Sequence, residues 1–169
     1  PTSTQVPPGI DLPALQRFVS DTLGGGAIER VELIEGGRSN LTYLVRGPGL
    51  DLVLRRPPLG HVLATAHDMA REHRFLRALR GTVPVPEPVA HCDDETVLGA
   101  PFYLMARVDG VVIRSAEDLA GVEPTAVTAA LAAMVDVLAG LHAVDPHAVG
   151  LGEVGVVGAR GFPVQELGQ

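Results

Sequence analysis

The sequence predicts an α+β fold in which an antiparallel sheet of five short strands packs against helices. First, three β-rich segments joined by short glycine turns lie between residues 28 and 55. Second, two more short β-rich segments follow, at 89–92 and 102–108. Third, apolar residues recur at helical spacing in three segments, which are 11–23, 66–79 and 123–142.

The chain begins with a Pro-, Ser- and Thr-rich stretch that predicts a flexible tail over residues 1–10. A helix is then expected from Asp11 to Leu23, because its leucines, Phe18 and Val19 recur at helical spacing. Asp11 is a candidate N-cap and Pro13 is tolerated in a first helical turn. The following run of three glycines, beginning at Gly24, ends the helix, which we expect on the back of the sheet.

Three strands are expected to form a meander, at Ile28–Ile34, Leu41–Val45 and Asp51–Arg55. Gly36-Gly37 and Gly47-Pro48-Gly49 supply the two turns. Since side chains alternate across a strand, Val53 and Arg55 share one face of the sheet. Leu52 and Leu54 then point the other way, toward the helix that covers the core.

The helix expected at Ala66–Leu79 places a carboxylate among apolar residues. Its stripe consists of Met69, Glu72, Leu76 and Leu79. A carboxylate within such a stripe is costly unless it is paired. From spacing alone, two readings of Glu72 stay open: it pairs with a cation, or it lies at the edge of the stripe in water.

The second half of the chain carries fewer chemical signals. Asp93-Asp94-Glu95 is predicted to be the solvated tip of a hairpin rather than a metal site, and Cys92 a small strand residue. Residues 115–121 are expected to be an irregular link, and Glu123–His142 a long amphipathic helix. His142 ends that helix and is predicted to be structural.

Composition narrows the function. The 169-residue chain has 46% hydrophobic residues and a net charge of −7, which argue for a globular fold and against binding to nucleic acids or anionic membranes. One cysteine allows no intrachain disulfide and suggests the cytoplasm. The most apolar segment, residues 126–144, contains Asp136 and His142, so no membrane span was expected.

Six stretches in order resemble one family: GGRSNLTY, LVLRRPP, AHDMAREHRFLRAL, VPVPEPVAHCDD, GAPFYLMARVDG and LHAVDP. Together, over residues 34–146, they resemble the nucleotide lobe of the aminoglycoside phosphotransferase family, which has a protein-kinase-like fold. The likeness is greatest to the branch whose eukaryotic members are fused to acyl-CoA dehydrogenases. It implies a nucleotide-binding N-terminal lobe at 11–108, a hinge and first helix of a C-terminal lobe at 109–150, and a poorly structured end of a truncated protein at 151–169.

The resemblance also implies a nucleotide site. Gly36, Gly37, Ser39 and Asn40, with Thr42, would form a phosphate cradle, although an ordinary hairpin turn has the same composition. Arg55 would hold the phosphates where the wider kinase pattern has lysine, and Glu72 would pair with it. If the register slips by one residue, Arg56 would hold the phosphates instead of Arg55. The alternative reading of both arginines is that they form a solvated strand end and bind no phosphate. Backbone groups of Ala106, Arg107 and Val108 would hold the adenine edge, with Val53 and Met105 in the cleft.

The implied cofactors are ATP and Mg²⁺, with the metal ligands in an absent C-terminal lobe. The implied reaction transfers the γ-phosphate of ATP to a hydroxyl of a small molecule, either aminoglycoside-like or a hydroxyacyl-CoA. The family's His-Gly-Asp catalytic loop does not occur in this sequence. We therefore expect no residue of the chain to be catalytic, and we expect the chain alone to be inactive. The alternative is a non-catalytic module that binds nucleotide or forms a homodimer through an exposed face of the lobe.

Overall fold

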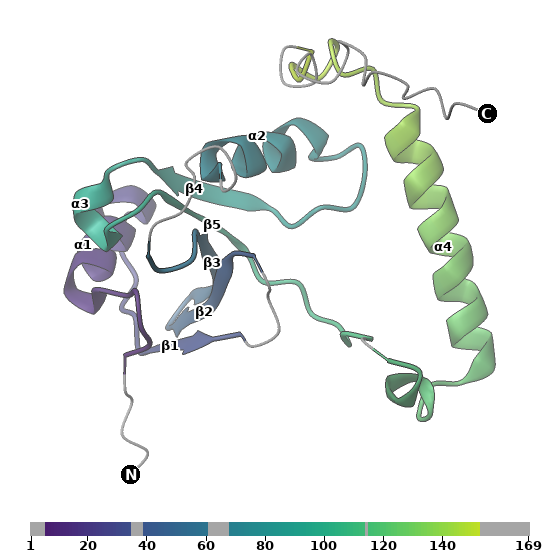
Figure 1. The fold of residues 1–169 in the computed structure, drawn as a ribbon, viewed down its shortest axis with the longest axis horizontal. Helices are drawn as coiled ribbons and strands as arrows, with labels where there is room; N and C mark the ends of the chain where they lie inside the picture. The colour runs from purple at the N-terminus through teal and green to yellow at the C-terminus, as the bar shows by residue number, and fades with distance from the viewer. Residues whose placement is uncertain (1–5, 35–38, 61–67, 114, 153–169) are drawn as a thin grey trace, which may run out of the picture. The chain divides into compact units, whose positions relative to one another are not determined.

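A computed structural model of the chain describes residues 6–34, 39–60, 68–113 and 115–152. They form two compact units, one containing residues up to 77 together with 85–110, and the other containing residues 78–84 and those after 110. The first unit contains the sheet shown in Figure 1. The functional lobes expected from the resemblance stay predictions.

The first unit is an α+β fold, as predicted. Its five strands form one antiparallel sheet in the order β1-β2-β3-β5-β4. The elements of this unit are α1 (Leu12–Leu23), β1 (Arg30–Leu33), β2 (Leu41–Gly47), β3 (Leu50–Arg56), α2 (Met69–Leu79) except its last two residues, β4 (Pro88–Cys92), α3 (Glu95–Leu98) and β5 (Phe102–Ala106).

Helix α1 begins and ends where its capping residues predict. The Asp11 carboxylate accepts a hydrogen bond from the Ala14 N–H at 2.9 Å, and Gly24 ends the helix in the left-handed conformation with φ of 76°. Leu15 and Val19 are fully buried in the core. Burying each such side chain contributes roughly 1.5–3 kcal/mol, which holds α1 on the sheet.

One face of the sheet forms the core with α1. The alternation predicted for β3 is confirmed, because Leu52 and Leu54 point into this core. Tyr43, Val45, Phe102 and Leu104 from β2 and β5 join them, and each of these four is buried to at least 99%. The Phe102 ring also meets Phe18 of α1 edge to face, with ring centroids 5.1 Å apart.

The geometry of the β2–β3 hairpin explains why residues 47 and 49 are glycines. Gly49 has φ of 74°, which a glycine adopts at no steric cost, and Pro48 before it fixes its own φ for the turn. A Cβ at Gly47 would lie 1.8 Å from the Ala27 carbonyl oxygen. The segment preceding β1 therefore approaches the hairpin too closely for any side chain at residue 47.

The acidic segment after β4 is not the hairpin tip that we predicted. Asp94 instead caps the four-residue helix α3, and its carboxylate accepts a hydrogen bond from the Thr96 N–H at 2.9 Å. Hydrogen bonding from Thr96, through its side chain first and its backbone amide second, holds the pKa of Asp94 below its usual value. Short polar side chains favour a cap as readily as a turn, and sequence alone did not separate the two.

Part of the stretch predicted to be a flexible tail, residues 1–10, is hydrogen-bonded to the sheet. The Tyr43 hydroxyl donates to the Pro8 carbonyl at 2.7 Å, and the guanidinium of Arg56 donates to the Gly9 carbonyl. Arg56 is only 4% exposed and also donates to the Leu98 carbonyl at 2.8 Å. Its burial lowers the pKa of the Arg56 guanidinium. Residues 1–5 lie outside the described residues.

The second unit contains a short 3₁₀ helix, η1 (Glu117–Leu119), within the link predicted to be irregular, followed by α4 (Pro124–His142). The start of α4 agrees with the sequence, but no residue in it is buried. Among the described residues, α4 is also the one helix long and apolar enough to cross a membrane by length and composition alone, with mean hydropathy of 1.7. Helices from soluble cores share these properties, so the test assigns no location.

Replacing Arg56 with alanine should lower the free energy of unfolding by roughly 1–3 kcal/mol, because the buried Leu98 carbonyl and the partly buried Gly9 carbonyl lose their donor. Urea denaturation followed by circular dichroism measures this. Arg30→Ala is the matched control, since Arg30 is a 59% exposed member of a surface pair with Glu32. An equal effect of both substitutions would contradict the structural role of Arg56.

Candidate functional site

The candidate site lies on the sheet face opposite the α1 core. The strand register places three side chains side by side there: Thr42 on β2 opposite Arg55 on β3, and Arg55 opposite Tyr103 on β5. We call these three residues the polar row. Arg55 is thus on the face predicted for it, and Arg56 is in the core, which excludes the alternative register.

At a distance of two residues from the polar row along each strand, the same face of the sheet is apolar. Leu44, Val53 and Met105 lie opposite one another on β2, β3 and β5 and form what we call the apolar row. Val53 is buried, and Leu44 and Met105 are half-buried. The face therefore changes from hydrophobic to cationic over the distance of two residues.

A charged group lies beyond the apolar row. Asp51 on β3 accepts hydrogen bonds from Arg107 at 2.8 Å and from Arg46 at 3.3 Å, and Arg107 also pairs with Asp109. The bond from Arg107 is the main reason that the pKa of Asp51 is lowered, and the same bond raises the pKa of Arg107. These contacts join the end of β5 to the β2–β3 hairpin.

The Glu72 carboxylate of α2 contacts three polar side chains from the sheet and the residue directly before β2: it forms one ion pair and accepts two hydrogen bonds. Arg55 Nε lies 3.4 Å from its Oε2, which confirms the predicted Glu72–Arg55 pair. Tyr103 donates its hydroxyl hydrogen to the same oxygen at 3.0 Å. Asn40, directly before β2, donates from Nδ2 to Oε1 at 2.8 Å. The carboxylate is 32% exposed, so it is neither free in water nor fully buried.

The Arg55–Glu72 contact is an ion pair without a regular hydrogen bond. Arg55 Nε is buried and has no hydrogen-bond partner of good geometry, and the 3.4 Å separation is long for a charge-assisted bond. The side chain is 33% exposed. Over the described ranges, Glu72 is the one acidic partner of Arg55, so the outer part of the guanidinium can bind a further anion.

Two histidines extend the polar row. His91 on β4 lies opposite Tyr103, and its ring stacks on His73 of α2 with centroids 5.4 Å apart. The His73 ring also contacts the Tyr103 ring at 5.9 Å. Burial, followed by the nearby His91 and Arg77, lowers the pKa of His73.

The predicted phosphate cradle is only partly described. Gly36 and Gly37 lie outside the described residues. Ser39 is exposed, whereas Asn40 is 7% exposed and its side chain contacts Glu72. The side-chain amide of Asn40 therefore contacts helix α2, and its role in a phosphate cradle stays a prediction.

Backbone groups of the three residues predicted to hold the adenine edge are partly bonded within the sheet. The Ala106 N–H already donates to the Glu87 carbonyl at 2.8 Å, and the Arg107 N–H donates to the Asp51 carbonyl at 3.2 Å. Among Ala106, Arg107 and Val108, this leaves the Val108 N–H as the amide without a partner in the described chain. The side chains of Met105 and Arg107 point to the candidate site, in the apolar row and the charged group.

Sequence reasoning missed Tyr103, His73 and His91. Alternation within FYLMA could have placed Tyr103 on the same face as Met105. No sequence signal sets the register between β5 and β3, because the two strands are separated by 45 residues and by helix α2. The meeting of Tyr103 with Glu72 therefore emerged only from the structure.

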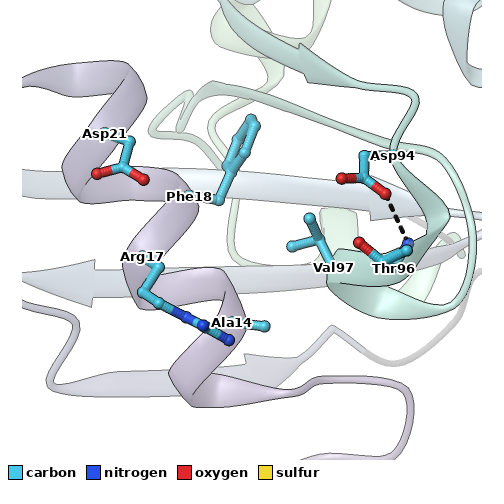
Figure 2. Close-up of a pocket in the computed structure, with 7 residues that line it drawn as sticks. All are labelled: Ala14, Arg17, Phe18, Asp21, Asp94, Thr96 and Val97. Carbon is cyan, nitrogen blue, oxygen red and sulfur yellow. Dashed lines mark hydrogen bonds between the residues drawn. The ribbon is translucent and has the colours of Figure 1, made fainter.

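A separate depression of about 370 Å³ lies outside the candidate site, between α1 and α3 (Figure 2). Phe18 and Val97 give it apolar walls, and Arg17, Asp21 and Asp94 line it. Because α1 covers the core face of the sheet, this depression and the Glu72 cluster are on opposite sides. None of the predicted nucleotide residues lines it.

The fold and the Arg55–Glu72 pair define a kinase-like N-terminal lobe, and comparisons with known proteins agree. The profile described as "Phosphotransferase enzyme family" matches residues 30–161. Over 148 residues the chain is 37% identical to mouse acyl-CoA dehydrogenase family member 10 (Mus musculus), and over 155 residues it is 36% identical to the probable acyl-CoA dehydrogenase IBR3 of Arabidopsis thaliana. Each match covers 86% of this chain, but only 14% and 19% of the respective relatives.

Solved structures give the same result. A candidate aminoglycoside phosphotransferase from Ralstonia eutropha superimposes with a TM-score of 0.69 at 37% identity, over 86% of this chain and 42% of that one. A GDP and kanamycin complex of an aminoglycoside phosphotransferase gives a TM-score of 0.58 at 18% identity, over 80% and 43% of the two chains, and supports the fold alone. The chain belongs to the phosphotransferase enzyme family. It spans less than half the length of these solved chains.

Replacing Glu72 with alanine should lower the free energy of unfolding by roughly 1–3 kcal/mol, because Asn40 and Tyr103 lose their hydrogen-bond acceptor and Arg55 loses its ion-pair partner. Chemical denaturation at pH 7 measures the loss. Glu32→Ala removes a carboxylate from a surface pair and serves as the control. A loss near zero for Glu72→Ala would show that the three contacts do not stabilise the fold.

Stability should fall on acidification because of His73. Its pKa is below the usual 6.5 in the folded state, so the unfolded chain binds more protons once the pH drops below 6.5. The contribution of neutral His73 to the free energy of unfolding is therefore fully present above pH 6.5. It is lost as the pH falls toward the pKa of His73 in the folded state. Urea midpoints at pH 7.5 and 5.5 should differ less in His73→Gln than in the wild type, whereas the exposed control His147→Gln should keep the wild-type difference. An unchanged difference in His73→Gln would contradict this assignment.

Proposed function

We propose that this chain is the nucleotide-binding part of a kinase-like phosphotransferase that transfers the γ-phosphate of ATP to a hydroxyl of a small molecule. The observation that carries the proposal is the Arg55–Glu72 pair at the end of a face that is apolar beside the predicted hinge. A nucleotide has the matching order, a flat base followed by anionic phosphates. Family membership supports phosphotransfer as the reaction class.

The described residues fit a nucleotide at both ends. The apolar row offers a surface for the base, and the neighbouring Val108 N–H can donate to its edge. Two residues further along β3, Arg55 has a partly exposed guanidinium whose Nε lacks a regular hydrogen bond. A guanidinium binds phosphate oxygens well because its charge is permanent and its donors are fixed in one plane. When bound, ATP supplies the phosphoryl group, while this chain orients the nucleotide.

Magnesium is expected to be held elsewhere in the whole protein. In the described part of the chain, no group of three or more His, Cys, Asp or Glu side chains could hold a metal ion. We propose that the Mg²⁺ ligands and the residue that orients the attacking hydroxyl belong to a C-terminal lobe. Phosphoryl transfer depends chiefly on positioning and charge neutralisation, so the role of this chain is to position the phosphates.

The acceptor has two proposed classes. Relatives named as acyl-CoA dehydrogenase family members support a hydroxyacyl-CoA, and the solved structure with kanamycin supports an aminoglycoside-like molecule. ATP consumption by the whole protein, tested with 3-hydroxybutyryl-CoA and with kanamycin in parallel reactions, distinguishes them. We also propose a cytoplasmic location, where ATP is plentiful.

A second candidate function is self-association without catalysis. One observation favours it: α4 exposes Leu131, Met134, Val135, Leu138 and Leu141. Exposed apolar side chains concentrated on one helix are typical of an association surface. Sedimentation equilibrium of the 169-residue chain tests this, and a monomer at high concentration would remove the candidate.

Replacing Arg55 with alanine should weaken MgATP binding at least roughly tenfold, because a charge-assisted contact to phosphate is lost. Isothermal titration calorimetry with the wild-type chain and the variant measures this, with MgGTP as a second nucleotide. Arg17→Ala removes an equal charge from the opposite side of the sheet and should retain wild-type affinity. Equal affinity of wild type and Arg55→Ala would contradict the proposed site.

A further inference from the structure

We infer that Tyr103 is a positioning residue for the nucleotide site and that it acts through Glu72. The inference rests on the proposed function and names a residue that the predicted site did not include. Tyr103 does not replace Arg55 as the phosphate-binding group. Its hydroxyl holds the carboxylate against which Arg55 is placed.

The contact geometry gives Tyr103 this role. Its O–H donates to Glu72 Oε2 at 3.0 Å, and Arg55 Nε lies 3.4 Å from the same oxygen. The neutral donor is therefore the closer of the two, and the cation makes only the looser ion pair. Because Tyr103 fixes the position of Oε2, it also fixes the location of the negative charge that Arg55 faces.

The second oxygen of the carboxylate is held from another strand. Asn40 Nδ2 donates to Oε1 at 2.8 Å, so each oxygen of Glu72 has its own neutral donor. A carboxylate held at both oxygens cannot rotate about its terminal bond. Without the Tyr103 hydroxyl, only Oε1 of Glu72 is held by a neutral donor. The Oε2 atom can then move, and the position of the Arg55 guanidinium is less well fixed.

Tyr103 is itself buried and packed on several sides. It is 3% exposed, its ring contacts His73 of α2, and it lies directly opposite both Arg55 and His91 in the sheet. Burial is the main cause of the raised pKa of its phenol, so the hydroxyl remains protonated and able to donate at physiological pH. A donor packed in this way limits the positions that the glutamate can take.

The chain provides a matched control, because it contains two tyrosines and both donate hydroxyl hydrogen bonds. Tyr43 on β2 is fully buried and donates to the Pro8 carbonyl at 2.7 Å. It points to the core face, whereas Tyr103 points to the candidate site. Tyr43→Phe and Tyr103→Phe therefore delete the same atom from opposite faces of one sheet.

The test is titration of MgATP into the wild-type chain and the two variants. Tyr103→Phe should weaken binding roughly three- to tenfold, as expected for loss of one orienting hydrogen bond. Tyr43→Phe should remain within about twofold of wild type, although both variants should unfold at lower urea concentration. Unchanged affinity in Tyr103→Phe, or an equal loss in Tyr43→Phe, would overturn the inference.

A second measurement separates this inference from the proposed function. The Nε–H resonance of Arg55 in the ligand-free, ¹⁵N-labelled chain is assigned by its absence in Arg55→Lys. Tyr103→Phe should shift this resonance and speed its exchange with water, and Tyr43→Phe should leave it unchanged. If the wild type binds neither MgATP nor MgGTP, the proposed function fails while this resonance still reports on Tyr103. An unshifted resonance in Tyr103→Phe overturns the positioning role even where nucleotide binds.

Discussion

The first unit depends on one carboxylate that receives donors from three places in the sheet. Glu72 lies on the helix, while Asn40, Arg55 and Tyr103 come from segments far apart in the chain. A helix and a sheet can pack through apolar contacts in many orientations, because such contacts are non-directional. Directional bonds to a single side chain restrict the position of α2 and the direction of the cation together. The same contacts to Glu72 therefore determine both how α2 packs on the sheet and where the Arg55 guanidinium lies.

The two faces of β3 explain how a strand of seven residues serves both the core and the site. Leu52, Leu54 and Arg56 lie on one face, and Val53 and Arg55 on the other. The consecutive arginines thus have unrelated environments. Arg56 is desolvated and bonded to neutral carbonyls, whereas Arg55 faces a carboxylate and remains partly exposed. The same residue type can be structural at one position and available to a ligand at the next, because a strand reverses its side-chain direction at every residue.

Much of this arrangement could be predicted from local patterns. Helix α1, the meander and the faces of Val53 and Arg55 follow from capping residues, glycine turns and alternation, all of which act over a few residues. The Glu72–Arg55 pair required the family resemblance, since spacing alone left Glu72 undecided. The α3 helix, the anchored segment before α1 and the contact of Tyr103 could not be predicted. Each depends on which distant backbone or side chain arrives beside it, and that is set by tertiary packing rather than by neighbouring sequence.

The bonds that fix residues 8 and 9 to the sheet have a consequence for comparing related chains. Tyr43 and Arg56 recognise carbonyl oxygens, which every amino acid carries, so the side chain at position 8 can diverge without loss of the bond. Position 9 differs, because Gly9 has φ of 82° and a Cβ there would lie 2.8 Å from Leu59 Cδ2. A change in the number of residues between Gly9 and the start of α1 would displace both the Gly9 carbonyl bound by Arg56 and the Pro8 carbonyl bound by Tyr43. The length of this stretch is therefore constrained by two hydrogen bonds to the sheet.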